Sequence, residues 1–328
     1  MTLKKYHIIW VALIWCITQV PVHSQQEPQY TQYMYNIGSF NPAYVGTVES
    51  TELSGLYRAQ WIDIPGAPRN IRFGANIPFN NEKMGMGFNI ISDALGPATQ
   101  TYIDVSYSYQ INLSDDSWLS FGIDAGGSLL NLDYSKGTFE NPGEPLIGGQ
   151  DFSEFYPVVG AGMFAYGDDW YVGVSIPNFL TLGIYEEELE AVVDNDLQFN
   201  FITGYVFDIS DRSKFKPAVL VNMLPGGPVN LNLSANFLFL DALTLGANYR
   251  IDNSISGVLG IQVSNSMFLG YSYDYNTNGL GEFNSGSHEA ILKFYLGRGD
   301  ANSSNGRNKQ KNKKLKGKPK QIDSPRFF

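Results

Sequence analysis

Between residues 50 and 297 the sequence repeatedly alternates apolar and polar side chains with a period of two. The pattern is clearest at 103–111, 229–239 and 243–251, where aliphatic and aromatic residues take turns with Asp, Ser, Asn and Gly. Strict alternation of this kind is typical of a β-strand with one apolar and one polar face. Because such strands have to pair with one another, the chain is predicted to be all-β.

Weaker copies of the pattern fill the rest of the span and bring the expected number to about fourteen strands, or roughly 18 residues for each strand with its loop. That spacing suits the ~10-residue strands that cross a membrane in a β-barrel. The expected strands lie at about 50–61, 70–78, 83–92, 103–111, 117–129, 155–166, 169–177, 197–208, 215–224, 229–239, 243–251, 254–264, 266–276 and 287–297.

The connections between these strands are short on one side of the expected sheet and longer on the other. Residues 167–169 and 241–242 are examples of the short ones, whereas 136–154 and 179–196 belong to the long ones. Outer-membrane barrels have short periplasmic turns and long outer loops. We therefore predict a transmembrane antiparallel outer-membrane β-barrel. An even number of strands would leave both termini in the periplasm.

Alternation alone is also compatible with a soluble β-sandwich, in which the apolar faces pack inward and the polar faces meet water. Two features favour the barrel. The strands follow one another without a domain break, and Tyr, Trp and Phe recur at strand ends, as in the aromatic girdles of membrane barrels. A soluble β-protein remains the alternative fold at this point.

Residues 1–24 have the pattern of a cleaved export signal. The basic pair Lys4-Lys5 precedes a short apolar run, and cleavage is expected before Gln25. The single cysteine, Cys16, lies inside this segment, so no disulfide is expected in the exported chain.

Charge divides the chain into three regions. Residues 1–24 hold two lysines and no acid, and residues 301–328 hold nine Lys or Arg against one Asp. The body between them, 25–300, holds 11 basic and 31 acidic residues, a net charge of −20. A surface of that sign repels the phosphates of nucleic acid, which is therefore excluded as a partner.

Two segments flank the expected barrel, which we assign to residues 50–297. Residues 25–49 are rich in aromatic and amide side chains, which favours a luminal plug or a periplasmic cap over a loosely packed linker. Residues 298–328 form a basic, disordered periplasmic tail, which either has no binding role or docks onto an acidic partner or anionic lipid. The lysines expected to dock are Lys309, Lys311, Lys313, Lys314, Lys316, Lys318 and Lys320.

The strand register assigns several charged residues to the polar inner face. Asp104, Asp124, Arg250, Asp252 and Lys293 are all expected to face the lumen. There they would either tune a channel or pair with one another to close it.

Residues suited to catalysis or metal binding are sparse. Outside the export signal His288 is the one histidine, and its place in the last expected strand favours a rim or packing role. The acidic run at 186–196 is expected to be a solvated face, with a calcium site as the alternative. We predict no catalytic residue, no metal site and no cofactor, and therefore a protein that is not an enzyme.

Three motifs give the chain a family resemblance. Residues 26–46 contain Gln-Glu-Pro, then Gln-Tyr-Met and Asn-Pro-Ala-Tyr. Residues 56–69 read Leu-Tyr-Arg-Ala-Gln-Trp followed by Ile-Pro-Gly-Ala-Pro-Arg, and residues 287–289 open the last strand with Ser-His-Glu. With these motifs the chain, from 25 to 297, resembles the PorP/SprF-type outer-membrane proteins of the type IX secretion system.

The resemblance implies a barrel needed for the export or surface attachment of large adhesins, including those used in gliding motility. Its implied partners are components of the type IX apparatus, the C-terminal domain of a secreted adhesin, or both, together with outer-membrane lipid. A passive porin or nutrient channel is the alternative function. The residues expected to contact a partner are Tyr30, Tyr33, Met34, Tyr35, Asn41, Pro42, Tyr44, Trp61, Pro65, Gly66, Pro68 and Arg69.

Overall fold

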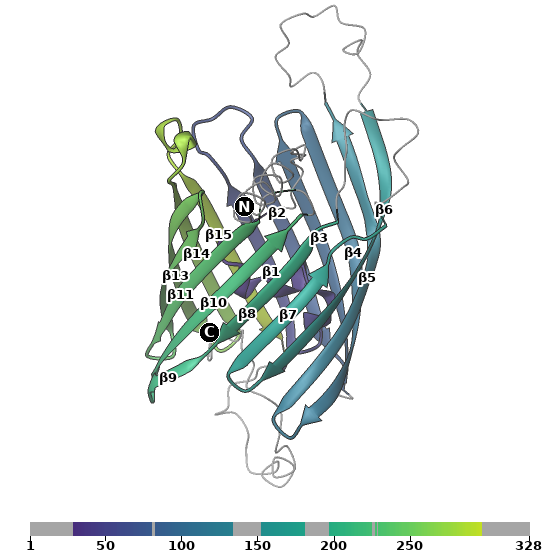
Figure 1. Ribbon diagram of the computed structural model, residues 1–328, viewed down its shortest axis with the longest axis vertical. Coiled ribbons are helices and arrows are strands. Elements are labelled where there is room, and N and C mark those ends of the chain that lie inside the picture. The colour runs from purple at the N-terminus through teal and green to yellow at the C-terminus, as the bar shows by residue number, and fades with distance from the viewer. Residues whose placement is uncertain are drawn as a thin grey trace, which may run out of the picture.

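The computed structural model describes residues 29–80, 83–133, 152–180, 197–224, 227 and 229–296. Within these ranges antiparallel strands form one closed sheet, in which the last strand pairs with the first (Figure 1). The expected export signal, the basic tail and the acidic run at 186–196 lie outside the described residues. The strands are β1 (Thr51–Ala59), β2 (Arg69–Pro78), β3 (Met84–Leu95), β4 (Ala98–Ser114), β5 (Ser117–Leu132), β6 (Phe152–Gly167), β7 (Trp170–Ile176), β8 (Phe199–Tyr205), β9 (Phe207–Ser210), β10 (Ser213–Met223), β11 (Asn230–Phe239), β12 (Leu243–Arg250), β13 (Ser254–Ser264), β14 (Met267–Asn276) and β15 (Ser287–Leu296).

The two short strands β8 and β9 are halves of one barrel strand. Both pair with β10, and a single residue, Val206, separates them. The Val206 N–H donates to the Asp169 carbonyl at 2.7 Å instead of continuing the ladder, and the Val206 side chain is buried. Counted as one, β8 and β9 make this a barrel of fourteen strands, which confirms the predicted fold.

The apolar face of each strand points outward. On β4 and β11 the side chains of Ile103, Val105 and Leu233 are exposed, whereas their neighbours Ser106 and Asn232 are buried in the interior. A soluble sandwich would have the opposite arrangement, with the apolar faces packed together. The outward apolar surface is the one that lipid requires, and the soluble alternative is wrong.

The barrel has a short-turn end and a long-loop end. At the short-turn end the strand pairs β4–β5, β6–β7 and β9–β10 are joined by two residues each. The loops after β1 and β14, at 60–68 and 277–286, lie at the opposite end. The described loops agree with the expected difference in part: only two residues, 96 and 97, join β3 to β4 at the long-loop end. The expected long loops at 136–154 and 179–196 lie almost entirely outside the described residues.

One of the residues expected in the lumen lies elsewhere. Arg250 and Lys293 are buried in the interior, and Asp104 and Asp124 also point inward, but Asp252 is exposed. It follows the end of β12, in a turn where its φ of 55° is left-handed. The turn ends the alternation two residues before Asp252, so extending the strand register to this position was wrong.

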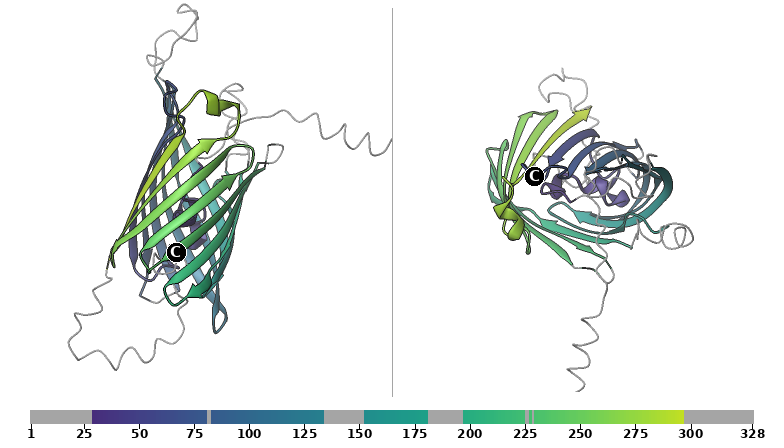
Figure 2. Two further views of the ribbon diagram at one scale, coloured as in Figure 1. Left: turned by 90° about the vertical axis from the view of Figure 1, so that its left-hand side faces the viewer. Right: turned by 90° about the horizontal axis from the view of Figure 1, so that it is seen from above.

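Residues 29–50, which we call the luminal segment, lie inside the barrel (Figure 2). The segment is folded into three short 3₁₀ turns, η1 (Tyr33–Tyr35), η2 (Ile37–Ser39) and η3 (Pro42–Tyr44). The side chain of Asn41 caps η3 by accepting from the Ala43 N–H at 3.0 Å, and Pro42 supplies the fixed φ that suits a first helical position. In the described residues no helix is long and apolar enough to cross a membrane.

Inward side chains of the barrel hydrogen-bond to the backbone of the luminal segment. Asn76 accepts from the Gly46 N–H at 2.8 Å, and the Gln110 side-chain amide donates to the Gly46 carbonyl at 2.8 Å. Ser175 donates to the Phe40 carbonyl at 2.6 Å. These bonds come from β2, β4 and β7 and satisfy backbone groups that irregular structure leaves unpaired.

Glycines let the luminal segment approach the wall closely. A Cβ added at Gly122 of β5 would lie 2.3 Å from the Ala43 backbone nitrogen, and one at Gly85 of β3 would lie 2.2 Å from the Gly46 Cα. Backbone atoms cannot yield as a flexible side chain does. The wall formed by β3 and β5 is therefore a rigid seat for the segment.

We expect Gly122→Ala to destabilise the folded barrel by about 1–3 kcal/mol, the usual effect of overpacking a well-packed core. The matched control is Gly257→Ala on β13, where an added Cβ meets nothing within 4 Å. The measurement is the temperature at which the compact band of the folded barrel disappears on electrophoresis. If both variants lost the compact band at the same temperature, the close backbone contact at Gly122 would be contradicted.

Candidate functional site

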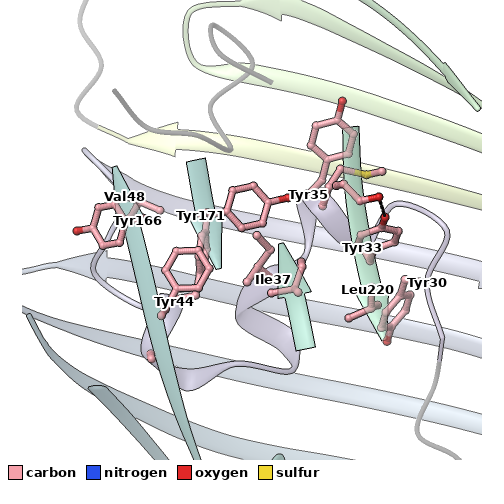
Figure 3. Close-up of a cluster of buried hydrophobic side chains, with 14 of the residues drawn as sticks. Tyr30, Tyr33, Tyr35, Ile37, Tyr44, Val48, Tyr166, Tyr171 and Leu220 are labelled. Atoms are coloured by element: carbon pink, nitrogen blue, oxygen red, sulfur yellow. Dashed lines mark hydrogen bonds between the residues drawn. The ribbon is translucent and has the colours of Figure 1, made fainter. Parts of the chain in front are cut away.

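Three tyrosines of the luminal segment form the centre of the barrel's core. Tyr33 is 0% exposed, and its hydroxyl donates to the Ala218 carbonyl and to Ser234, each at 2.9 Å. The rings of Tyr35 and Tyr44 pack against aromatic rings of the wall (Figure 3). Burial raises the pKa of Tyr33 and of Tyr35 above that of a free phenol, because it disfavours the phenolate. Both tyrosines stay neutral.

The other expected contact residues of the segment are also enclosed. The Tyr30 hydroxyl donates to the Asn70 side chain at 2.7 Å, and Met34 is fully buried. The side-chain amide of Asn41 donates to the carbonyls of Met163 and Val174 at 3.2 and 3.4 Å, across β6 and β7. In this conformation the segment contacts the barrel and presents little surface to another protein.

Three charged residues with inward side chains form a buried group that we call the luminal ion cluster: Arg58 of β1, Asp274 of β14 and Glu289 of β15. Arg58 Nη2 lies 2.7 Å from Asp274 Oδ2, and Arg58 Nη1 lies 3.0 Å from Glu289 Oε2. All three residues are at most 2% exposed. Arg58 and Glu289 are directly opposite each other on paired strands, so strand pairing itself brings them together.

The cluster also binds the start of the luminal segment. The backbone N–H groups of Thr31 and Gln32 donate to the two carboxylate oxygens of Glu289, at 2.9 and 2.8 Å. The Thr31 hydroxyl donates to Asp274 at 2.8 Å. Hydrogen bonds to a charged group are stronger than neutral ones, so this is a firm attachment between segment and wall.

Two loops at the long-loop end are joined by backbone hydrogen bonds. The Ile62 N–H donates to the Gly286 carbonyl at 2.9 Å, and the Ser285 N–H donates back to the Ile62 carbonyl at 3.0 Å. The Ser285 hydroxyl donates to Asp63 at 2.5 Å. Residues 60–68 and 277–286 therefore form one unit, which we call the loop surface.

The backbone of the loop surface is held in an uncommon conformation. Trp61 and Asp63 have φ angles of 46° and 79°, in the left-handed region that bulky residues rarely adopt. Such a conformation persists only where the surroundings enforce it, and it is found most often at functional sites. Here the Trp61 N–H donates to Ser287 at 3.2 Å, and the paired loops hold the residues on either side.

Apolar groups of the loop surface reach the solvent. Phe283 is 71% exposed, and Leu280 in the short turn η6 (Gly279–Glu282) is also exposed. Pro65, Gly66 and the adjoining Arg69 are exposed, Trp61 is half-buried and Pro68 is buried. The backbone of Gly66 extends the unit to a further connection, by accepting from the Gly96 N–H at 2.9 Å.

The residues expected to contact a partner thus divide into two groups. Tyr30, Tyr33, Met34, Tyr35, Asn41, Pro42 and Tyr44 lie in the lumen, and Trp61, Pro65, Gly66, Pro68 and Arg69 lie at or beside the loop surface. The structure does not merge the groups into one exposed patch. A role in partner binding stays a prediction for both, and the docking lysines of the tail lie outside the described residues.

Sequence reasoning missed the residues that link these two groups. Arg58 lies inside the Leu-Tyr-Arg-Ala-Gln-Trp motif and Glu289 inside Ser-His-Glu, but neither was picked out as a site residue. Their common signal is a charged side chain at an inward position close to the same end of its strand. Asp274, three residues before the 277–286 loop, has that signal too.

His288 lies on the outer face of β15. Its Nδ1 is 2.6 Å from the Tyr271 hydroxyl, and the ring of Tyr273 is close by. In the described residues no group of three or more His, Cys, Asp or Glu is arranged to hold a metal ion.

A closed fourteen-stranded barrel with an apolar exterior is the architecture of an outer-membrane protein. The model of the family described as type IX secretion system membrane protein PorP/SprF matches residues 22–294. The chain belongs to this family and is a protein of the outer membrane. No curated protein matches it.

Several solved barrels are similar in fold. The CymD monoaromatic hydrocarbon channel has 11% sequence identity and a TM-score of 0.48, over 80% of this chain and 91% of that chain. A Pseudomonas aeruginosa FadL homologue has 11% identity and a TM-score of 0.41, over 81% and 93%. The KdgM porin in complex with disordered oligogalacturonate has 6% identity and a TM-score of 0.37, over 75% and 99%. At these values the likenesses support no conclusion about function.

We expect Arg58→Met to destabilise the barrel by about 3–5 kcal/mol, because it leaves two carboxylates buried without their cation. Arg69→Met is the matched control, since Arg69 is exposed. The measurement is the urea concentration at which the tryptophan fluorescence of the detergent-solubilised protein changes. A midpoint for Arg58→Met equal to that of the control would show that the cluster contributes no stability.

Proposed function

We propose that this outer-membrane barrel binds the C-terminal domain of a large secreted adhesin, or components of the type IX apparatus, and so serves adhesin export or surface attachment in secretion and gliding. Membership of the family supports the link to the type IX system. The observation that supports a docking role is the loop surface, which is a preformed unit with exposed apolar side chains above a lumen that the chain itself occupies.

In this proposal the long-loop end faces the exterior and the short-turn end faces the periplasm, as in other outer-membrane barrels. Thr51 and Leu296, the first and last residues of the barrel wall, are paired at the short-turn end. The chain thus enters and leaves the wall on the side that we assign to the periplasm. Cargo would meet the loop surface, and the apparatus would meet the short turns.

The anchors of the loop surface would be Trp61 and Phe283. Aromatic residues and arginine dominate the energetics of protein interfaces, and Arg69 adjoins the surface. Because hydrogen bonds already hold the loops in place, binding would cost little ordering of the backbone. The luminal segment would contribute indirectly, by keeping the wall beneath these loops in position.

The tail expected at the C-terminal end is strongly basic. Residues 301–328 hold nine Lys or Arg against one Asp, a net charge of +8. We propose that it docks onto an acidic periplasmic partner or anionic lipid headgroups, through the lysines from 309 to 320.

A passive porin or nutrient channel is the competing function. It requires a lumen open to solutes, whereas the luminal segment fills the interior with buried aromatic rings. The family and the fold point to a membrane component of secretion or a channel and do not suggest an enzyme. The two competing functions differ in what they predict for partner capture and for conductance.

The test is a pull-down of the tagged full-length chain from its native outer membrane in mild detergent, with the bound proteins quantified by mass spectrometry. We expect type IX components or one large adhesin to be recovered. The double variant Trp61→Ala/Phe283→Ala should reduce that recovery about tenfold or more, the effect of losing interface anchors. Ile103→Ala is the control, because Ile103 is exposed on the outer face of β4, away from both ends of the barrel.

Two results would contradict the proposal. One is recovery of the same partner by the double variant at the level of the control. The other is recovery of the barrel alone together with steady conductance of the unmodified chain in planar bilayers, which would support the channel function.

A further inference from the structure

We propose that the luminal ion cluster couples the loop surface to the luminal segment. In this view a displacement of the loops moves Asp274 and Glu289 and loosens the start of the segment from the wall. The inference rests on the proposed function, because it describes how the docking surface would be regulated. Its test below needs no partner and therefore fails or succeeds independently of docking.

Toward the long-loop end, the strands that carry the cluster lead into the loop surface. Arg58 is one residue from the end of β1, Asp274 is two residues from the end of β14, and Glu289 is the third residue of β15. These strands lead directly into residues 60–68 and 277–286. Each charged group is therefore attached to a loop through at most a few residues of extended backbone, which transmits displacement well.

One contact makes this link especially tight. Gly286 has a φ of 87°, and a Cβ added to it would lie 2.5 Å from the Asp274 carbonyl oxygen. On its other side Gly286 accepts the hydrogen bond from Ile62 that joins the two loops. A shift of the loops at Gly286 therefore presses on the backbone of Asp274 or moves away from it.

Toward the lumen, the cluster binds the start of the luminal segment. The Glu289 carboxylate accepts hydrogen bonds from the backbone N–H groups of Thr31 and Gln32, and Asp274 accepts one from the Thr31 hydroxyl. A displacement of Glu289 alone would leave Arg58 paired with Asp274, which it contacts at 2.7 Å. The displaced arrangement would then keep one buried ion pair, and a switch needs two arrangements that are both tolerated.

Some buried polar atoms at and beside the cluster make no hydrogen bond in the described structure. Gln32 Oε1, Arg58 Nε and Arg250 Nη2 are buried with no hydrogen-bond partner in the part of the chain that the structure describes. A buried polar atom without a partner costs free energy in the observed structure. The free-energy difference between this structure and one in which the start of the segment has left the wall is therefore smaller. On β3 and β5 the close backbone contacts at Gly85 and Gly122 hold the later part of the segment, so it would move away at its start and remain in place there.

The experiment measures how fast a buried reporter in the segment reacts. Met34 is 0% exposed, so in Met34→Cys the thiol is protected as long as the segment stays in place. The single natural cysteine, Cys16, lies in the expected export signal. The full-length chain is exported, purified in mild detergent and labelled with a polyethylene-glycol maleimide, and protein without the reporter gives the background.

Two pairs of variants are then added to the reporter. Gly286→Ala changes the loop side of the cluster, and Gly279→Ala is its control, since an added Cβ at Gly279 meets nothing within 4 Å. Glu289→Gln weakens the attachment of the segment. Its control is Glu52→Gln, which disturbs the other buried ion pair between β1 and β15, Glu52 with Lys293.

We expect Gly286→Ala and Glu289→Gln each to raise the labelling rate about tenfold or more, the effect of losing hydrogen bonds to a charged group. The two controls should label as slowly as the reporter alone. All variants are compared at equal recovery of the folded, compact band on electrophoresis.

The outcomes separate the parts of the proposal. Equal rates for Gly286→Ala and Gly279→Ala, with Glu289→Gln fast, would show an attachment that the loops do not control and would overturn the coupling. Equal rates for Glu289→Gln and Glu52→Gln would overturn the attachment itself. A docking assay that fails while the labelling rates change as expected would remove the proposed function and leave the coupling in place.

Discussion

The structure depends on one constraint: in lipid, every backbone N–H and C=O group of a spanning strand has to be paired within the protein. Closure of the sheet between β1 and β15 meets this requirement around the wall. The requirement also explains why the break at Val206 is compensated by a bond to the Asp169 carbonyl and followed by renewed pairing of β9 with β10. Once the sheet is closed in lipid, its alternating side chains can be arranged in only one way. The apolar face meets lipid, and the small and polar face is left to line an interior.

That interior would be costly if it were left to polar side chains alone, and the chain fills it with its own residues 29–50. Tyr33, Tyr35 and Tyr44 supply the aromatic burial that a soluble domain obtains by packing two layers together. The close contacts at Gly85 and Gly122 allow backbone to lie directly on backbone, so on β3 and β5 the segment is held by shape. On β1, β14 and β15 it is held by charge, at Arg58, Asp274 and Glu289. The two modes of attachment respond differently to a disturbance, because close packing fails only when backbones move, whereas an ion pair can exchange partners.

The sequence alone predicts the strands, but it does not predict the contacts between strands that are far apart in the chain. Period-two alternation is a local property, so all fourteen strands were predictable, and so was the inward direction of Arg250 and Lys293. Asp252 was assigned wrongly because the alternation cannot show where a strand gives way to a turn with positive φ. The luminal ion cluster was missed for a different reason. Arg58 and Glu289 are 231 residues apart, and only the closure of the barrel sets the two strands side by side in this register.

The same reasoning explains why the two groups of expected contact residues look unrelated in the sequence and are connected in the fold. Trp61 is three residues beyond Arg58, and Gly286 is three residues before Glu289, so the loop surface and the cluster share their supporting strands. Thr31 and Gln32 of the luminal segment bind the cluster from the lumen. Under the proposed coupling, a residue deep in the lumen would therefore influence the docking surface without touching the partner. In a barrel whose exterior is committed to lipid, the lumen is the one place where the two ends of the protein can be linked by side chains.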